Sequence, residues 1–461
     1  MLYGVNMRNK KLIIIISLVA VILRLVLCSI NRDANDDHVT VVNIIADQHY
    51  LPEKADCWSC FQPKLYYYVN ALIVDWFNIP DKLPRIKMMQ TVNFVCSLII
   101  LFFMFKFISK YISDTELQAA VFALFSLNPA LLGINSQGTN DTMTIMFGVI
   151  SIFYMDKLFS NWKLSDITVV IIAIIGACLS KANGVVLFGC FILMMLIKLW
   201  ANKDKELNKK IMMYFIVMLA VCGIIIFVAG NYYYNYEHFG TPFVSAFDTT
   251  TPPAFFKNTS AGRPGIQSVF EGFFSFRFGD MLNQPYITNG GENYPLHRTS
   301  FWSQLYGRSF FIHFEQWPEA WQKTDQLTIW IGRLALIFGL FPALIFVIGF
   351  LKLLKESFTN FVFLRSEKVN ETHSWMHLGI TLAYVIFILK FSYDVRDFAC
   401  FKPIYILPGL ISFIYVFMEG LKSAKKYISE KVLVSGLLIL VSIHVIDLSY
   451  LAVHLHYNYH R

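Results

Sequence analysis

Charged residues are scarce in this chain. Only 15% of its 461 residues are Asp, Glu, Lys or Arg, whereas ordinary soluble domains have about 25%. Hydrophobic residues make up 56% of the chain, which is more apolar surface than a soluble domain can bury. This composition excludes a soluble enzyme, a disordered regulator and a nucleic-acid-binding module. It predicts an all-α polytopic membrane protein.

Internal repeats and a second Cys-x-x-Cys motif are also missing. The absence of a repeat disfavours an inverted-repeat transporter. With a single Cys-x-x-Cys, from Cys57 to Cys60, the sequence offers too few ligands for zinc, and a thioredoxin-like context is absent. We predict a structural disulfide between Cys57 and Cys60 in an oxidising compartment, with Cys400 as the alternative partner for one of them.

Eleven apolar runs predict about eleven transmembrane helices. Basic residues precede the first run and gather in alternate connecting segments, which places the N-terminus inside and the C-terminus outside. The stretch 167–199 is too long for one span and short for two, but a polar break at 180–184 and the charge distribution favour a hairpin. The predicted spans are 12–30, 88–105, 118–133, 142–157, 167–180, 183–199, 211–229, 327–351, 378–391, 404–419 and 432–451.

Two segments predicted to lie outside are long. The first outer segment, 31–86, contains an amphipathic stretch over 65–77 that is too short to span and is expected to lie in the membrane interface. The outer cap segment, 230–325, is rich in Gly, Pro, Asn, Tyr and Trp, and we expect it to cover the outer face. The expected modules are therefore 1–229, which includes the first outer segment, then the cap, then 326–461.

An adjacent acid pair, Asp36 and Asp37, follows the first predicted span and is followed directly by His38. Carboxylates at a membrane surface can hold a metal, bind a cation or accept the proton of a hydroxyl. The alternative is a solvated loop start whose acids cap the next helix. A divalent metal is compatible with these residue types but is not indicated by them, and no cofactor is predicted.

Further polar groups fall where membrane chains usually avoid them. Asn140 and Asp141 open the fourth predicted span, Lys181 lies at the tip of the hairpin, and Arg396 and Lys402 lie in the short outer loop before the tenth. Each cation alone could be a snorkelling anchor. Two acidic clusters and three cations on one outer face instead predict a functional site. Cations suit a lipid-linked phosphate, and a carboxylate suits an acceptor hydroxyl.

These features resemble, in their order along the chain, a GT-C type glycosyltransferase of the protein O-mannosyltransferase and aminoarabinose transferase superfamily. Each motif is degenerate alone, and the ordered set is more specific. Lys64 departs from the family, which usually has a second proline there, and the outer cap segment has no counterpart that we can place. The resemblance is carried by Asp36-Asp37-His38, by Gln62-Pro63-Lys64-Leu65-Tyr66-Tyr67, by Asn140-Asp141, by Leu179-Ser180-Lys181-Ala182-Asn183-Gly184, and by Arg396 followed by Tyr405-Ile406-Leu407-Pro408.

The resemblance implies an inverting transfer of a sugar from a dolichyl or undecaprenyl phosphate to a hydroxyl of a lipid, glycan or protein. The reaction would take place on the outer face of a bacterial inner membrane or the lumenal face of the endoplasmic reticulum. The resemblance favours Asp36 as the base, with Asp37 beside it, although the chemistry alone accepts either acid. A phosphate leaves without a general acid. The reaction therefore needs one base for the acceptor hydroxyl and cationic side chains that stabilise the negative charge on the leaving phosphate. The implied substrate contacts are His38, Gln62, Tyr66, Asn140, Asp141, Lys181, Arg396 and Lys402.

Three other functions remain open from the sequence. A transporter or flippase for a lipid-linked or carbohydrate substrate would use the same charges, although they cluster at one face and not at the bilayer midplane. An O-antigen ligase or polymerase would use arginines and a catalytic histidine in place of the acid pair. A non-catalytic assembly subunit would tolerate replacement of the acid pair.

Overall fold

The computed structural model describes residues 7–33, 36–244, 269–286, 296–314, 318–362, 373–395 and 401–460. Within these ranges the regular structure is entirely helical. Each of the eleven apolar runs predicted as spans overlaps helical structure. The predicted fold class, an all-α multi-pass membrane protein, is confirmed.

Eight helices of the described chain are long and apolar enough to cross a membrane, and nine spans result if one bent pair is counted as a single crossing. Two further apolar runs form shorter helices, α8 (Leu164–Ser180) and α19 (Leu410–Ala424). The count of eleven spans is consistent with this arrangement. The eight long helices are α1 (Met7–Ile30), α4 (Leu83–Tyr111), α7 (Asp141–Asn161), α9 (Val185–Ala201), α10 (Lys205–Ala229), α16 (Gln326–Val362), α18 (Ser374–Val395) and α20 (Glu430–His460).

The predicted span at 118–133 is a bent pair of helices rather than one straight helix. The helix α5 (Thr115–Ser126) and the helix α6 (Pro129–Asn135) meet at an angle of 53°. The bend follows from Asn128-Pro129, because proline disfavours a helical residue before it but fits the first turn of the next helix. Asn128 caps α6, its side chain accepting from the Leu131 backbone N–H at 3.1 Å. The bend directs α6 toward the cavity described below.

The predicted polar break at 180–184 is present. Lys181 is extended, with φ −157° and ψ 146°, and follows the last residue of α8. A short 3₁₀ turn, η1 (Ala182–Gly184), then leads into α9. Gly184 is required there, since a Cβ would lie 2.4 Å from the Ala177 carbonyl carbon. This close approach lets the chain reverse while Lys181 projects from the ends of two helices.

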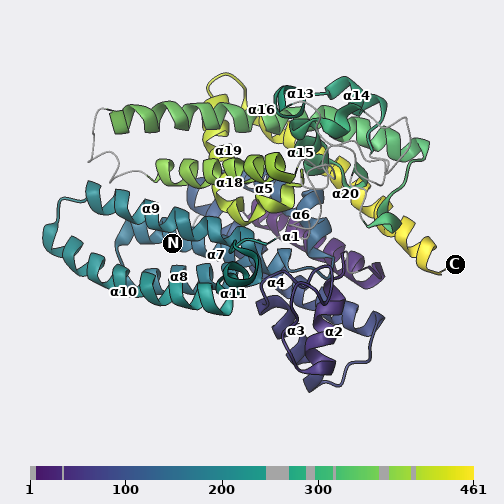
Figure 1. The fold of residues 1–461 in the computed structure, drawn as a ribbon. Helices are drawn as coiled ribbons and strands as arrows, with labels where there is room; N and C mark the ends of the chain where they lie inside the picture. Colours follow the sequence, from purple (N-terminus) through teal and green to yellow (C-terminus); the bar gives the residue numbers. More distant parts are fainter. Residues whose placement is uncertain are drawn as a thin grey trace.

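The first outer segment contains α2 (His38–Gln48) and α3 (Leu65–Trp76), which pack side by side at one corner of the molecule (Figure 1). The stretch expected to be an amphipathic helix is therefore helical. Tyr68, Leu72 and Trp76 recur every four residues on its exposed face, and Trp76 is 82% exposed. Such a face suits the membrane interface, and that location stays a prediction.

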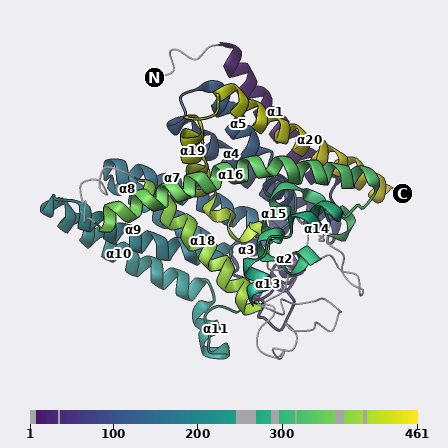
Figure 2. The ribbon, with the colours of Figure 1, turned by 90° about the horizontal axis from the view of Figure 1, so that it is seen from above.

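The described part of the outer cap segment consists of short helices joined by irregular chain. Figure 2 shows several of them gathered beside α16. Asn128 Nδ2 donates to the Ser309 carbonyl at 2.8 Å, and Trp321 Nε1 donates to Asn31 Oδ1 at 3.2 Å. The cap and the first outer segment therefore meet at the same end of the helix bundle. The cap helices are α11 (Tyr232–Phe239), α13 (Val269–Phe274), α14 (Phe278–Asn283), η2 (Leu296–Thr299), α15 (Phe301–Phe310), η3 (Ile312–Phe314) and η4 (Glu319–Trp321).

Candidate functional site

The acid pair lies at the start of α2. Asp37 is the residue before the helix, and its carboxylate accepts a hydrogen bond from the Thr40 hydroxyl. Asp36 is exposed and has a φ of 40°, in the left-handed region that residues other than glycine adopt at a cost. Among the described residues, none donates a hydrogen bond to the Asp36 carboxylate. Asp36 is thus the more exposed acid of the pair.

His38 is buried directly behind the acid pair. Its Nδ1 lies 2.6 Å from the Tyr67 hydroxyl of α3, and the two rings stack with centroids 5.7 Å apart. Burial lowers the pKa of His38 to about 4, although the nearby Asp36 carboxylate opposes this shift. The imidazole is therefore neutral at pH 7, and it joins α2 to α3 rather than carrying charge into the site.

Asp141 and Lys181 form a buried ion pair. Lys181 Nζ lies 2.6 Å from Asp141 Oδ1, and the side chains are only 10% and 4% exposed. Asp141 is the first residue of α7, where the helix dipole favours a carboxylate. The ammonium also lies 5.5 Å from the centre of the Tyr405 ring. The pair fixes the start of α7 against the break after α8.

Amide side chains connect this ion pair to the first outer segment. Asn140 Nδ2 donates to the Ser180 carbonyl at 2.8 Å and lies 3.5 Å from Gln62 Oε1. Tyr66 is fully buried in α3, and its hydroxyl reaches the Met89 carbonyl of α4 at 3.5 Å. Gln62, Tyr66 and Asn140 therefore join four elements at one end of the bundle.

The loop before Gln62 is braced in two ways. A disulfide links Cys57 and Cys60. Lys64, where the resembling family has a proline, is buried and donates to the Cys60 carbonyl. Burial lowers the pKa of this ammonium to about 8. At position 64 this chain therefore has, in place of a rigid proline, a lysine whose side chain hydrogen-bonds to the backbone of the same loop.

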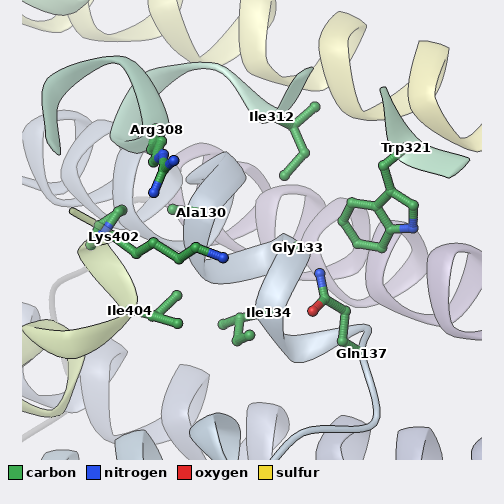
Figure 3. A pocket seen from close by; sticks show the side chains of 10 residues that line it. Ala130, Gly133, Ile134, Gln137, Arg308, Ile312, Trp321, Lys402 and Ile404 are labelled. Carbon is green, nitrogen blue, oxygen red and sulfur yellow. The ribbon is translucent and has the colours of Figure 1, made fainter. Parts of the chain in front are cut away.

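A cavity of about 50 Å³ lies between α6, α15 and the chain around Lys402 (Figure 3). Lys402 stands just before the turn η6 (Pro403–Tyr405), and Tyr405 is the ring that Lys181 approaches. Two of the lining residues, Arg308 of α15 and Lys402, are basic, and the lining contains neither Asp nor Glu within the described chain. In the figure their charged groups point into the cavity. The lining residues are Ala130, Gly133, Ile134, Gln137, Arg308, Ile312, Trp321, Lys402, Pro403 and Ile404.

The turn between α6 and α7 separates the cavity from the Asp141–Lys181 pair. Asn93 of α4 holds this turn, because its Nδ2 donates to the carbonyls of Gln137 at 2.6 Å and Thr139 at 2.8 Å. Gln137 lines the cavity, and Asn140 begins the contacts with Gln62. The basic cavity and the amide cluster are therefore the two sides of one polypeptide turn.

The structure groups the predicted site residues in two places. The acid pair, His38, Gln62, Tyr66, Asn140, Asp141 and Lys181 form one connected region, whereas Lys402 lies in the basic cavity beside Arg308. Arg396 and Cys400 lie outside the described residues. Within the described ranges, no group of three or more His, Cys, Asp or Glu side chains is arranged to hold a metal ion.

Sequence reasoning did not identify Arg308, Gln137 or Trp321. Arg308 lies in the outer cap segment, for which no motif was available. The signal that could have found it is a lone arginine beside Gly307 in a helix capped by Ser300, a position that is almost fully buried here. Gln137 lies only three residues before the recognised Asn140-Asp141 motif.

No family model matches the sequence, and no curated protein matches it. The structure is similar to the crystal structure of ArnT from Cupriavidus metallidurans bound to undecaprenyl phosphate, with a TM-score of 0.36 and 10% sequence identity. The similarity covers 95% of this chain and 77% of that chain. At this TM-score the likeness assigns no residue and no ligand to this chain.

Proposed function

We propose that this protein is a membrane glycosyltransferase that moves a sugar from a polyprenyl phosphate to an acceptor hydroxyl on the non-cytoplasmic face, with inversion. One observation carries the proposal: an available carboxylate, Asp36, lies at the same end of the bundle as a cavity with two basic residues and no acid in its described lining. Asn31 joins the cavity wall to the start of the first outer segment, since its side chain accepts from Trp321 and donates to the Asp33 carbonyl at 3.0 Å.

The chemistry assigns a role to each side. Asp36 takes the proton of the acceptor hydroxyl as its oxygen attacks the anomeric carbon from the face opposite the phosphate. The bond from the anomeric carbon to the phosphate oxygen breaks, and the phosphate leaves with the electron pair. Arg308 and Lys402 stabilise the negative charge on that phosphate. A second carboxyl group is unnecessary, in contrast to glycoside hydrolysis, because the leaving group is already weakly basic.

The remaining predicted contacts form the floor of the site. The Asp141–Lys181 pair is internally neutralised and holds α7 against the α8–α9 break. Gln62 and Asn140 present amide groups beside it. We assign the recognition of sugar hydroxyls to these amides, because amide groups can both donate and accept hydrogen bonds.

The test is sugar transfer by purified full-length protein in lipid nanodiscs, supplied with radiolabelled sugars on undecaprenyl or dolichyl phosphate. Asp36→Asn should lose transfer by about 10²–10⁴-fold, the usual cost of replacing a base, and should still bind undecaprenyl phosphate. Asp75→Asn is the matched control, because Asp75 is an exposed acid of the same outer segment.

Three outcomes separate the alternatives. If Asp37→Asn abolishes transfer and Asp36→Asn does not, the two acids exchange roles. Full activity in both variants removes the acid pair from the chemistry and the glycosyltransferase proposal with it. Transfer that depends on an arginine and a histidine but not on either acid would favour the ligase class.

A second candidate, a transporter or flippase, is favoured by one observation. Asp156 of α7 is buried within a predicted span and accepts from Lys110 at 2.5 Å and from the Tyr111 hydroxyl at 2.6 Å, with His377 Nε2 3.4 Å away. Buried ionisable groups of this kind serve proton coupling in transporters. They lie about 22 Å along α7 from Asp141, at 1.5 Å per residue. Movement of undecaprenyl phosphate across proteoliposomes that is lost in Asp156→Asn would support this candidate.

A further inference from the structure

One wall of the basic cavity is formed by Ile312 and Trp321. Figure 3 shows these two side chains on the side away from Arg308 and Lys402. They pack on α6 at Gly133, where a Cβ would come within 2.6 Å of Ile312 Cδ1 and 3.3 Å of the Trp321 ring. The width of the cavity therefore depends on how closely η3 and η4 are held against the bundle.

A single buried carboxylate from the last membrane helix reaches both residues of this wall. Asp447 of α20 is 0% exposed. Its Oδ2 accepts from the Ile312 backbone N–H at 3.0 Å. Its Oδ1 lies 3.5 Å from His313 Nε2, and His313 Nδ1 lies 2.9 Å from the Trp321 carbonyl. Asp447 thus contacts η3 directly and η4 through one imidazole.

The hydrogen-bond partners determine where the protons must be. The Trp321 carbonyl can only accept, so His313 Nδ1 carries a hydrogen and donates it. The Ile312 N–H makes Asp447 Oδ2 an acceptor. His313 Nε2 and Asp447 Oδ1 then face each other, and neither has another hydrogen-bond partner in the described chain. Two bare acceptors would repel, so one proton lies between them, and the pair carries no net charge beside the basic cavity.

We infer that Asp447 is a positioning residue for the donor site: it holds the Ile312–Trp321 wall so that the cavity keeps the width that a phosphate group needs. This inference rests on the proposed function, since it takes lipid phosphate as the ligand of the cavity. Asp447 itself is separated from the cavity by the wall that it holds. Its effect is therefore on donor binding and not on the proton transfer at Asp36.

The proton arrangement predicts different effects for two substitutions of Asp447. In Asp447→Asn the amide oxygen accepts from the Ile312 backbone N–H, and the amide N–H donates to His313 Nε2. Both hydrogen bonds therefore persist, although residue 447 no longer titrates. In Asp447→Leu both bonds are lost while the side chain keeps the same branched shape. We expect Asp447→Leu to weaken undecaprenyl phosphate binding and to raise the donor KM by about tenfold, the usual effect of an unsatisfied buried partner. The kcat at saturating donor and the acceptor KM should stay within about twofold, and Asp447→Asn should resemble the unaltered protein.

Asp166→Asn is the control for a merely structural role, because Asp166 is a buried carboxylate that pairs with Lys157 at the start of α8, at the opposite end of α8 from Lys181. It should lower thermal stability without changing the donor KM. Equal weakening of binding by Asp166→Asn and Asp447→Leu would overturn the inference, and so would equal effects of the Asn and Leu substitutions at 447. If Asp447→Leu does not fold, His313→Leu, which breaks only the link to Trp321, should show a smaller rise in donor KM; an unchanged KM there also overturns it.

A second readout is independent of the lipid. Gln137 lines the cavity, so in Gln137→Cys the rate at which the new thiol reacts with a methanethiosulfonate reagent reports access to the cavity. We expect faster labelling in Asp447→Leu than with Asp447 intact, after subtraction of the reaction of the native cysteines. Equal rates would show that Asp447 does not hold the wall. If the unaltered protein binds no polyprenyl phosphate, the proposed function fails, and this labelling still decides the inference.

Discussion

Lys181 Nζ lies 2.6 Å from Asp141 Oδ1, in a site where both side chains are nearly buried. Asp141 is the first residue of α7, and Lys181, 40 positions later, directly follows the last residue of α8. Because each neutralises the other, this pair adds little net charge to the site, and a direct contact of Lys181 with a phosphate stays a prediction. In the proposed function, Arg308 and Lys402 of the basic cavity hold the leaving phosphate. We therefore propose different roles for the two charge clusters: the ion pair fixes the packing of α7 against the α8–α9 break, and the basic cavity binds the donor.

Breaking this ion pair should strongly destabilise the protein. Lys181→Ala or Asp141→Ala leaves one charge buried without its partner, which typically costs about 3–5 kcal/mol. The double variant should be less destabilised than the sum of the two single variants. Thermal unfolding of detergent-purified protein measures this. Lys390→Ala is the matched control, since the Lys390–Asp394 pair has the same 2.6 Å separation but is largely exposed, and such pairs contribute about 0–1 kcal/mol.

If Lys181→Ala proves as mild as Lys390→Ala, the pair is not buried in the membrane-embedded protein. If both single variants fold normally but lose donor binding, Lys181 contacts the phosphate after all.

Acidification should act through His38. Burial lowers the pKa of His38 to about 4 in the folded protein, whereas an unfolded histidine titrates near 6.5. The unfolded state therefore binds more protons between these values, and stability falls as the pH is lowered from about 6.5 toward 4. His38→Gln removes this contribution while keeping a polar group near Tyr67. The thermal midpoint should fall less steeply over this pH window in His38→Gln, and parallel curves would count against a buried neutral His38.

The apolar runs predicted the helices well because hydrophobicity over about 20 residues is a local property of the sequence. The bend between α5 and α6 has a local signal, Asn128-Pro129, whereas the hydrophobicity of 118–133 predicts a single span. Local patterns could not predict that Asp141 pairs with Lys181 or that Arg308 and Lys402 line one cavity. Each of these pairings depends on how elements distant in the sequence pack together. Arg308 had the weakest signal, since its segment contains no recognised motif.

Filling the wall contact should impair donor binding selectively. In Gly133→Ala the new Cβ would lie 2.6 Å from Ile312 Cδ1, so Ile312 and the Trp321 ring must move. We expect a rise in the donor KM with little change in kcat. Gly189→Ala is the matched control, because a Cβ at that helical position meets nothing within 4 Å. A donor KM unaffected by Gly133→Ala would mean that the donor phosphate does not enter this cavity.

The two basic residues of the cavity give the most direct test of the donor site. Removing a charged hydrogen-bond donor from a phosphate typically costs about 1.5–3 kcal/mol. Arg308→Ala and Lys402→Ala should therefore each weaken the binding of undecaprenyl phosphate by about 10–150-fold, at 1.4 kcal/mol per factor of ten. Arg308→Lys should recover part of the loss, since it keeps the charge but not the planar, bidentate donor geometry. Lys355→Ala is the control, because Lys355 is an exposed cation of α16.

Inorganic phosphate, added as a competitor, separates the contribution of the headgroup from that of the prenyl chain. Competition only at concentrations far above those of the lipid would show that the chain contributes most of the affinity. Undiminished binding in both alanine variants would remove the cavity from donor recognition, and with it the observation on which the glycosyltransferase proposal rests.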